Sequence, residues 1–187
     1  MHNLSHRRAG RDDWKKAIQR MIGTAARFAS EGHRCLLVVT SEKERKYLLG
    51  RAERDGLEGV VSYGKGLSPR VAAERFKDGA GMVLVGKSAN YAEGADFPDG
   101  LAPVTLMLRP GWASPNDPMS QFEERRFSKS RVWQLRMHRI ALEAQQVRGR
   151  NIRGPDDVGV TFFLTEGFRT FLRGAMPAWL EPSYRGN

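Results

Sequence analysis

The chain has 187 residues, 40% of them hydrophobic, and its 31 Lys and Arg against 21 Asp and Glu give a formal charge of +10. This length suits one α/β domain with a real core and leaves little room for two. No apolar run approaches the ~20 residues of a membrane span, and no apolar segment follows the charged start as in a secretory signal, so a cytoplasmic location is expected. The positive charge favours a polyanionic partner, most often nucleic acid, over a merely soluble basic surface.

Metal chemistry and disulfides find little support in the sequence. The only cysteine is Cys35, inside an apolar run, so no internal disulfide and no cysteine cluster for zinc or an iron–sulfur centre can form. The four histidines show no ligand spacing.

Apolar periodicity predicts helices and strands in alternation after a flexible segment at residues 1–10. The first helix is expected from Asp12 to Ala29. Ser41-x-x-Glu44 is a capping box that opens the next helix, and Ser68 followed by Pro69 opens the third. Strands are expected at residues 35–39, 59–63, 82–85, 103–109 and 160–164. Helices are expected at residues 12–29, 41–54, 68–76, about 119–145 and 166–172.

The predicted strands are apolar on both faces, which is typical of a buried parallel sheet. We therefore expect a single α/β domain over residues 11–187, with a mostly parallel sheet, helices on both of its faces, and a long helical insertion at about 119–145. In such sheets chemistry sits at the carboxyl ends of strands. An apolar stripe along the insertion includes Trp133, which predicts that this ring lies in the core, whereas Trp112 is open to a role in base stacking.

Residues Gly81–Ser88 satisfy the written P-loop pattern G-x-x-x-x-G-K-S. The four intervening residues of a P-loop must form a flexible loop around phosphate. Here they are Met-Val-Leu-Val, which predicts a buried strand. The pattern is therefore interpreted as a coincidence.

Two other segments carry candidate chemistry. Arg150 and Arg153 lie three residues apart, on one face of a helix, and can aim two guanidinium groups at one polyanion, with Gln146 on the same side. The alternative is a basic helix end facing water. In the loop after residue 86, Ser88 and the backbone amides could hold a phosphate, and Lys87 adds a cation. Glu93 and Asp96 add hydrogen-bond acceptors, although such glycine-rich acidic loops also bind calcium or simply turn.

The order of these motifs resembles the second RecA-like motor lobe of superfamily 2 helicases, most closely the DinG/XPD branch. The resemblance covers roughly residues 30–180. It rests on Thr40-Ser41 after a strand, Gly86-Lys87 with Glu93-Gly94-x-Asp96, Pro115-Asn116-Asp117-Pro118, Gln146-x-x-Gly149-Arg150-x-x-Arg153 and Asp157-Val158-Gly159. One departure is Glu166, where the family often has Asp in an Asp-x-x-Arg or Asp-x-Arg pattern, and the loop from Lys87 to Glu93 is longer than in some members.

The resemblance implies an RecA-like fold and a role as the C-terminal motor lobe of an ATP-dependent 5′→3′ DNA helicase. ATP and Mg²⁺ would be bound through a first lobe that this sequence does not contain, so the isolated chain is expected to be inactive. Arg150 and Arg153 would be arginine fingers, and Gln146 would orient phosphate or water. The nucleotide would also meet Glu93, Gly94, Asp96 and Gly149. Single-stranded DNA would be held by Thr40, Ser41, Lys87 and Ser88.

Several readings stay open. Ser41 serves equally well as a helix cap alone. The chain could also be a non-catalytic module for nucleic-acid binding or partner docking that keeps the lobe's shape. Repair, transcription and CRISPR-associated interference are all compatible with the sequence, and the departure at Glu166 fits a CRISPR-associated DinG relative.

Overall fold

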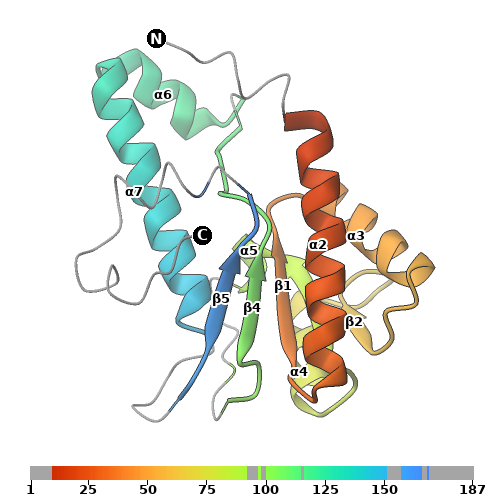
Figure 1. Cartoon of the computed structure of the whole chain (residues 1–187). Helices are drawn as coiled ribbons and strands as arrows, with labels where there is room; N and C mark the ends of the chain where they lie inside the picture. Colours follow the sequence, from red (N-terminus) through yellow and green to blue (C-terminus); the bar gives the residue numbers. More distant parts are fainter. Residues whose placement is uncertain are drawn as a thin grey trace.

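The apolar run Cys35–Val39 forms β1, the central strand of a five-stranded parallel sheet in the computed structural model (Figure 1). The strand order is β2-β3-β1-β4-β5, and every pairing among these strands is parallel. The structure describes residues 10–91, 97, 100–114, 116–150, 157–165 and 168. The other strands are β2 (Val60–Ser62), β3 (Val83–Lys87), β4 (Val104–Met107) and β5 (Val160–Phe163). The helices are α2 (Gly10–Ser30), α3 (Glu42–Arg54), α4 (Pro69–Lys77), α5 (Ser88–Tyr91), α6 (Pro118–Arg126) and α7 (Lys129–Arg148).

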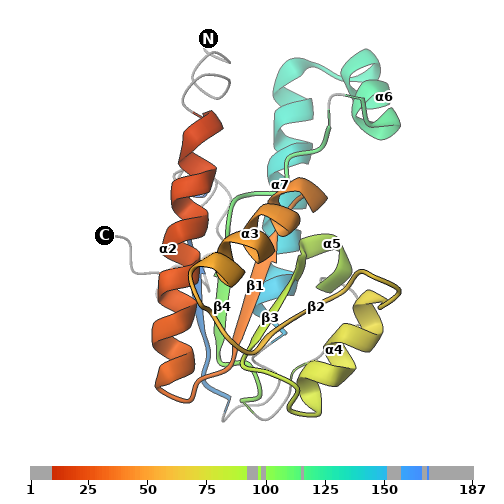
Figure 2. The same cartoon turned by 90° about the vertical axis from the view of Figure 1, so that its right-hand side faces the viewer.

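Helices cover both faces of the sheet because successive side chains of a strand point to opposite faces (Figure 2). In β1, Leu37 packs with α2 and α3, whereas Leu36 and Val38 pack with α4, α5 and α7. Both residue sets are almost fully buried. The predicted parallel α/β fold is confirmed.

Local sequence signals set the helix boundaries as expected. The Ser41 hydroxyl accepts a hydrogen bond from the Glu44 N–H, and the Glu44 carboxylate accepts one from the Ser41 N–H, which completes the capping box. The Ser68 hydroxyl accepts from the Val71 N–H at the start of α4. Gly32 ends the α2 segment with a φ of 84°, a conformation that glycine adopts without a steric cost.

The P-loop pattern lies on a strand, as its apolar residues predict. β3 runs from Val83 through Lys87 and pairs with both β1 and β2. A methyl group added at Gly86 would lie 1.9 Å from the Tyr91 ring, so this glycine permits α5 to fold back against the strand. The backbone amides of these residues are therefore committed to the sheet and cannot encircle a phosphate.

The single long helix expected at about 119–145 is wrong: the segment forms two helices joined at Phe127 and Ser128. Asp117 caps α6, where its carboxylate accepts from the Ser120 N–H, and Ser128 caps α7, where its hydroxyl accepts from the Arg131 N–H. Each cap satisfies donors that a continuous helix would bond internally. We call residues 118–139, which comprise α6 and the first half of α7, the hairpin.

Trp133 is not in the core, contrary to the expectation from the apolar stripe. Ile140, Ala141 and Ala144 of the same stripe are buried, whereas Trp133 is 46% exposed. The reason is that the N-terminal half of α7 extends past the carboxyl ends of the strands, where no sheet lies beneath it (Figures 1 and 2).

No helix in the described part of the chain is both long and apolar enough to cross a membrane. The helix expected at residues 166–172 falls outside the described residues, except for Phe168. The Phe168 side chain is buried in the core cluster formed with α4, α5 and α7.

Candidate functional site

The carboxyl end of β1 is organised by one buried carboxylate. Glu44 is 4% exposed. Its Oε2 accepts hydrogen bonds from the Thr40 N–H (3.1 Å), the Thr40 hydroxyl (3.0 Å) and the Ser41 N–H (3.0 Å). The loop that follows β1 is therefore held in one conformation by a residue of the next helix.

Arg109 extends this arrangement to the neighbouring strand. It follows β4 and donates from Nε to Glu44 Oε1 at 2.5 Å. Burial raises the pKa of the Glu44 carboxyl, but the charge of Arg109 and the hydrogen bonds from Arg109 and Thr40 outweigh it and hold that pKa below its usual value. The carboxylate is thus ionised at neutral pH and joins two loops at the same edge of the sheet.

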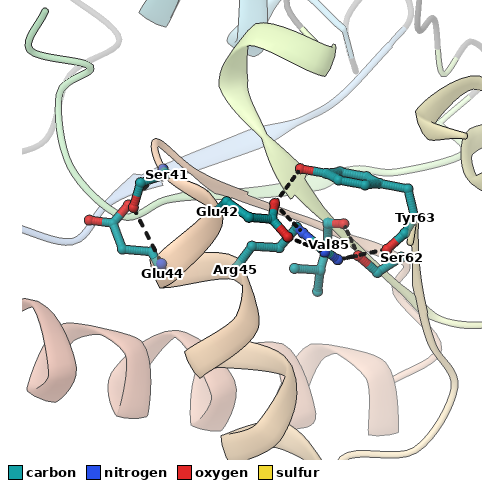
Figure 3. Close-up of polar contacts among 7 residues, drawn as sticks. All are labelled: Ser41, Glu42, Glu44, Arg45, Ser62, Tyr63 and Val85. Carbon is teal, nitrogen blue, oxygen red and sulfur yellow. Dashed lines mark hydrogen bonds and ion pairs between the residues drawn. The ribbon is translucent and has the colours of Figure 1, made fainter. Parts of the chain in front are cut away.

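A second network lies beside the first, around the buried side chain of Arg45 (Figure 3). The Arg45 guanidinium donates to both carboxylate oxygens of Glu42 at 2.9 and 2.5 Å, and to the Ser62 hydroxyl (2.8 Å) and the Tyr63 carbonyl (2.7 Å). It also lies 4.1 Å from the centroid of the Tyr63 ring. The Ser62 hydroxyl donates to the Val85 carbonyl (2.8 Å), which ties α3 to β2 and β3. These contacts occupy the Arg45 guanidinium, so we assign Arg45 a structural role.

Lys87 ends β3 and pairs in register with Val39 of β1, so it lies at the carboxyl edge beside Thr40. The pKa of Glu42 is lowered chiefly by the hydrogen bond from Arg45, with a smaller electrostatic contribution from Lys87. Lys87 is partly exposed, whereas Ser88, the first residue of α5, is only 4% exposed. A phosphate at this edge would meet the lysine more readily than the serine.

The four residues expected to hold DNA differ in whether their hydrogen-bond donors are already used within the protein. The Thr40 hydroxyl proton and both loop N–H groups already go to Glu44. The Ser41 hydroxyl accepts from the Glu44 N–H and keeps its own proton. Ser41 and Lys87 are therefore the two that can donate to a phosphate without rearrangement.

Gln146, Gly149 and Arg150 lie at the other end of the lobe, where α7 ends. α7 runs opposite to the strands, so its C-terminal end lies toward their amino ends (Figure 1). Gly149 caps the helix through its N–H, which donates to the Gln145 carbonyl at 2.8 Å. Gln146 is an exposed residue of α7, whereas the partly buried Arg150 lies beyond the end of the helix at Arg148, so the expected helix face that carries both residues is wrong.

One backbone contact links Phe97 to the arginine motif. The Phe97 N–H donates to the Arg150 carbonyl at 3.1 Å, and Phe97 is fully buried against Phe76 of α4. In the sequence, Phe97 comes directly after Asp96, the last residue of the loop expected to meet the nucleotide. Glu93, Gly94, Asp96 and Arg153 themselves lie outside the described residues.

Comparison with known proteins identifies the family of this chain. Residues 25–183 match the family model described as the helicase C-terminal domain. The chain belongs to this family. No curated protein sequence matches the chain.

Solved helicase structures share the fold. Xpd4 of S. tokodaii is 15% identical with a TM-score of 0.59, over 91% of this chain and 33% of that one. A structure titled XPD_APO is 13% identical with a TM-score of 0.61, over 88% and 34%. S. cerevisiae Dbp5 bound to RNA and ADP BeF3 is 14% identical with a TM-score of 0.52, over 88% and 37%. The chain thus spans about a third of the length of these proteins, and the likeness is one of fold.

Arg109 and the Arg45 network were not found from the sequence as parts of the site. Arg109 ends an apolar run and so carried a signal, since a charged residue at the carboxyl end of a buried strand needs a partner or water. Its partner lies 65 residues away in the chain, on a helix whose packing no local pattern specifies.

Proposed function

We propose that this lobe is the second motor domain of a DinG/XPD-type, ATP-dependent 5′→3′ DNA helicase, and that its two ends serve two different ligands. Arg150 and Arg153 contact ATP held by a first lobe, and Ser41 and Lys87 contact the phosphates of single-stranded DNA. The observation that supports the proposal is the hydrogen bond from the Phe97 N–H to the Arg150 carbonyl, which links the arginine motif to a buried residue that directly follows Asp96 in the sequence.

The arginine end suits phosphoryl transfer. A guanidinium beside the γ-phosphate offsets charge that develops in the transition state, an effect worth ~10³–10⁵ in rate in comparable systems. Lysine replaces it poorly because it lacks the planar fork of donors. Among the described residues no cluster of His, Cys, Asp or Glu could hold a metal ion. Following the family resemblance, we assign the Mg²⁺ ligands to the first lobe, and Gln146 and Asp96 to the orientation of ATP.

The carboxyl edge suits single-stranded DNA because the residues that carry its hydrogen-bond donors are fixed by buried contacts. Glu44 and Arg109 fix the loop that carries Ser41, and β3 fixes Lys87 beside it. Closure of the lobes around ATP would then move this edge along the strand. An isolated lobe would bind single-stranded DNA weakly, with an affinity that falls steeply with salt, since the contacts are to phosphates.

The test is Arg150→Ala in the complete protein. ATP hydrolysis and strand separation should fall by about 10³-fold or more, while the dissociation constant for single-stranded DNA stays within about twofold of the parent value. Arg150→Lys should recover little of the rate, because a point charge does not replace the fork. Normal turnover by Arg150→Ala would refute the assignment and favour a non-catalytic binding or docking module with the same fold.

A further inference from the structure

The hairpin extends beyond the carboxyl ends of the strands, on the same side of the lobe as Ser41 and Lys87 (Figures 1 and 2). It exposes three aromatic side chains, with Phe122 at 57%, Phe127 at 43% and Trp133 at 46%. A single exposed apolar side chain is ordinary, whereas a group of them can mark a binding site. The surroundings of Trp133 show which of the two applies to the hairpin.

Trp133 is held in place by a second indole. Its ring stacks on Trp112 with the centroids 5.7 Å apart and the planes 27° from parallel. Trp112 lies in the loop after β4 and packs against the core cluster beneath α7. In the same loop Gly111 approaches α7 so closely that a methyl group there would lie 2.3 Å from a Glu143 carboxylate oxygen. The indole of Trp133 is thus supported from one side and exposed on the other, as a flat and rigid platform.

The hairpin around this platform is basic. It carries six Lys and Arg residues and two glutamates. Both glutamates are paired within the hairpin: Glu123 binds Arg139 and Glu124 binds Arg136. The remaining cations are all exposed, and no carboxylate in the described part of the chain pairs with them. These are Arg125, Arg126, Lys129 and Arg131.

Lys129 stands one helical turn before Trp133 and so on the same face of α7. An aromatic face among unpaired cations matches single-stranded nucleic acid, whose bases stack on the ring while its phosphates meet the charges. A protein partner that covered a tryptophan would bring apolar area of its own and would gain little from four surplus cations. The charge therefore favours a polyanion with flat bases.

The platform is also connected to the edge proposed to hold DNA. The Leu108 N–H donates to the Val38 carbonyl, and the next residue, Arg109, binds Glu44 beneath Ser41. From Arg109 to Trp112 is three residues, a reach of at most about 10 Å. Single-stranded DNA that extends beyond Ser41 and Lys87 can therefore reach the hairpin directly.

We propose that Trp133 stacks on a base of single-stranded DNA and that Arg125, Arg126, Lys129 and Arg131 neutralise phosphates around it, so that the hairpin extends the strand's path beyond the carboxyl edge. The ligand class rests on the proposed function. The stacking site itself is an additional contact that the edge residues do not require.

The test compares two labelled strands of equal length and charge, each of about 20 nucleotides: oligo(dT), and an abasic strand that keeps the phosphates but has no bases. Binding to the 187-residue chain is followed by fluorescence anisotropy. Trp133→Ala should weaken oligo(dT) binding by about tenfold or more and change abasic-strand binding by less than about twofold. Trp133→Phe should keep most of the affinity, since the ring remains. Leu142→Ala is the matched control: it shortens another exposed apolar residue of α7 and should change neither strand.

Lys87→Ala separates this proposal from the proposed function, because a phosphate contact weakens both strands alike. If Lys87→Ala weakens both strands and Trp133→Ala weakens neither, or both equally, the stacking site is overturned and the DNA-binding edge stands. If only Trp133→Ala acts, and only on oligo(dT), the platform stands and the edge assignment fails. Trp133→Leu, which keeps apolar bulk against Trp112, provides the same comparison should the alanine variant unfold.

Discussion

Replacing Glu44 with alanine removes the group on which the carboxyl edge is built, and its cost follows from the contacts. The carboxylate accepts four hydrogen bonds, two from backbone N–H groups, one from the Thr40 hydroxyl and one from Arg109. A buried donor left without a partner costs about 1–3 kcal/mol. Arg109 is 33% exposed, so water compensates for much of what it loses.

We expect Glu44→Ala to lower the free energy of unfolding by about 3 kcal/mol, mainly through the two stranded N–H groups and the broken capping box. For a domain of this size that is a fall in melting temperature of about 6–12 °C. Urea denaturation followed by circular dichroism measures the change. Glu53→Ala is the control, since Glu53 is an exposed residue of the same helix. It should change stability by less than about 0.5 kcal/mol.

The same carboxylate makes stability depend on pH in a defined direction. The pKa of Glu44 is lower in the folded chain than its ordinary value of 4.5. Its contribution is therefore fully present above pH 4.5 and is lost as the pH falls below that value through the lower folded pKa. Glu44→Gln cannot titrate and should flatten the acid limb of the stability profile. A loss below about 0.5 kcal/mol for Glu44→Ala, with an unchanged acid limb, would refute this account of the edge.

Two further predictions concern the sheet. Gly86→Ala should destabilise the chain by about 1–3 kcal/mol in urea denaturation, because the added methyl group meets the Tyr91 ring. The control Gly50→Ala, in an open position of α3, should instead stabilise the chain by up to about 1 kcal/mol. Equal effects of the two substitutions would contradict the packing of Tyr91 against Gly86. Cys35 is fully buried in β1, and burial raises the pKa of its thiol to about 12, so a maleimide probe should label it only at the rate of unfolding; rapid labelling of the native chain would place β1 at the surface.

Much of the fold could be predicted because it rests on local signals. The continuous apolar runs identified the buried strands, and Ser41 and Ser68 identified helix starts through the hydrogen bonds that they accept. The alternation of these elements implied a parallel sheet without any knowledge of its strand order. The break at Ser128 was missed because helical periodicity continues on both sides of it. A helix cap can be recognised in a sequence only where the helical periodicity stops on one side of it.

The candidate site was less accessible to sequence reasoning because its contacts are not local. The sequence indicated Thr40 and Ser41 but not that Glu44 takes most of their donors, which depends on side-chain geometry. The exposure of Trp133 depends on where α7 leaves the sheet, and periodicity gives the face of a helix but not the extent of what it packs on. Glu93, Gly94, Asp96 and Arg153 lie outside the described residues, so the meeting of the two nucleotide motifs stays a prediction.

The central claim is that the two ends of the lobe serve two ligands, and DNA-stimulated ATP hydrolysis by the complete protein tests it most directly. With single-stranded DNA as the titrant, Arg150→Ala should lower kcat by about 10³-fold or more and leave the half-saturating DNA concentration unchanged. Lys87→Ala should raise that concentration and leave kcat near the parent value. If Arg150→Ala shifts the DNA concentration but not kcat, or Lys87→Ala abolishes kcat at saturating DNA, the division of the lobe into an ATP end and a DNA end is wrong.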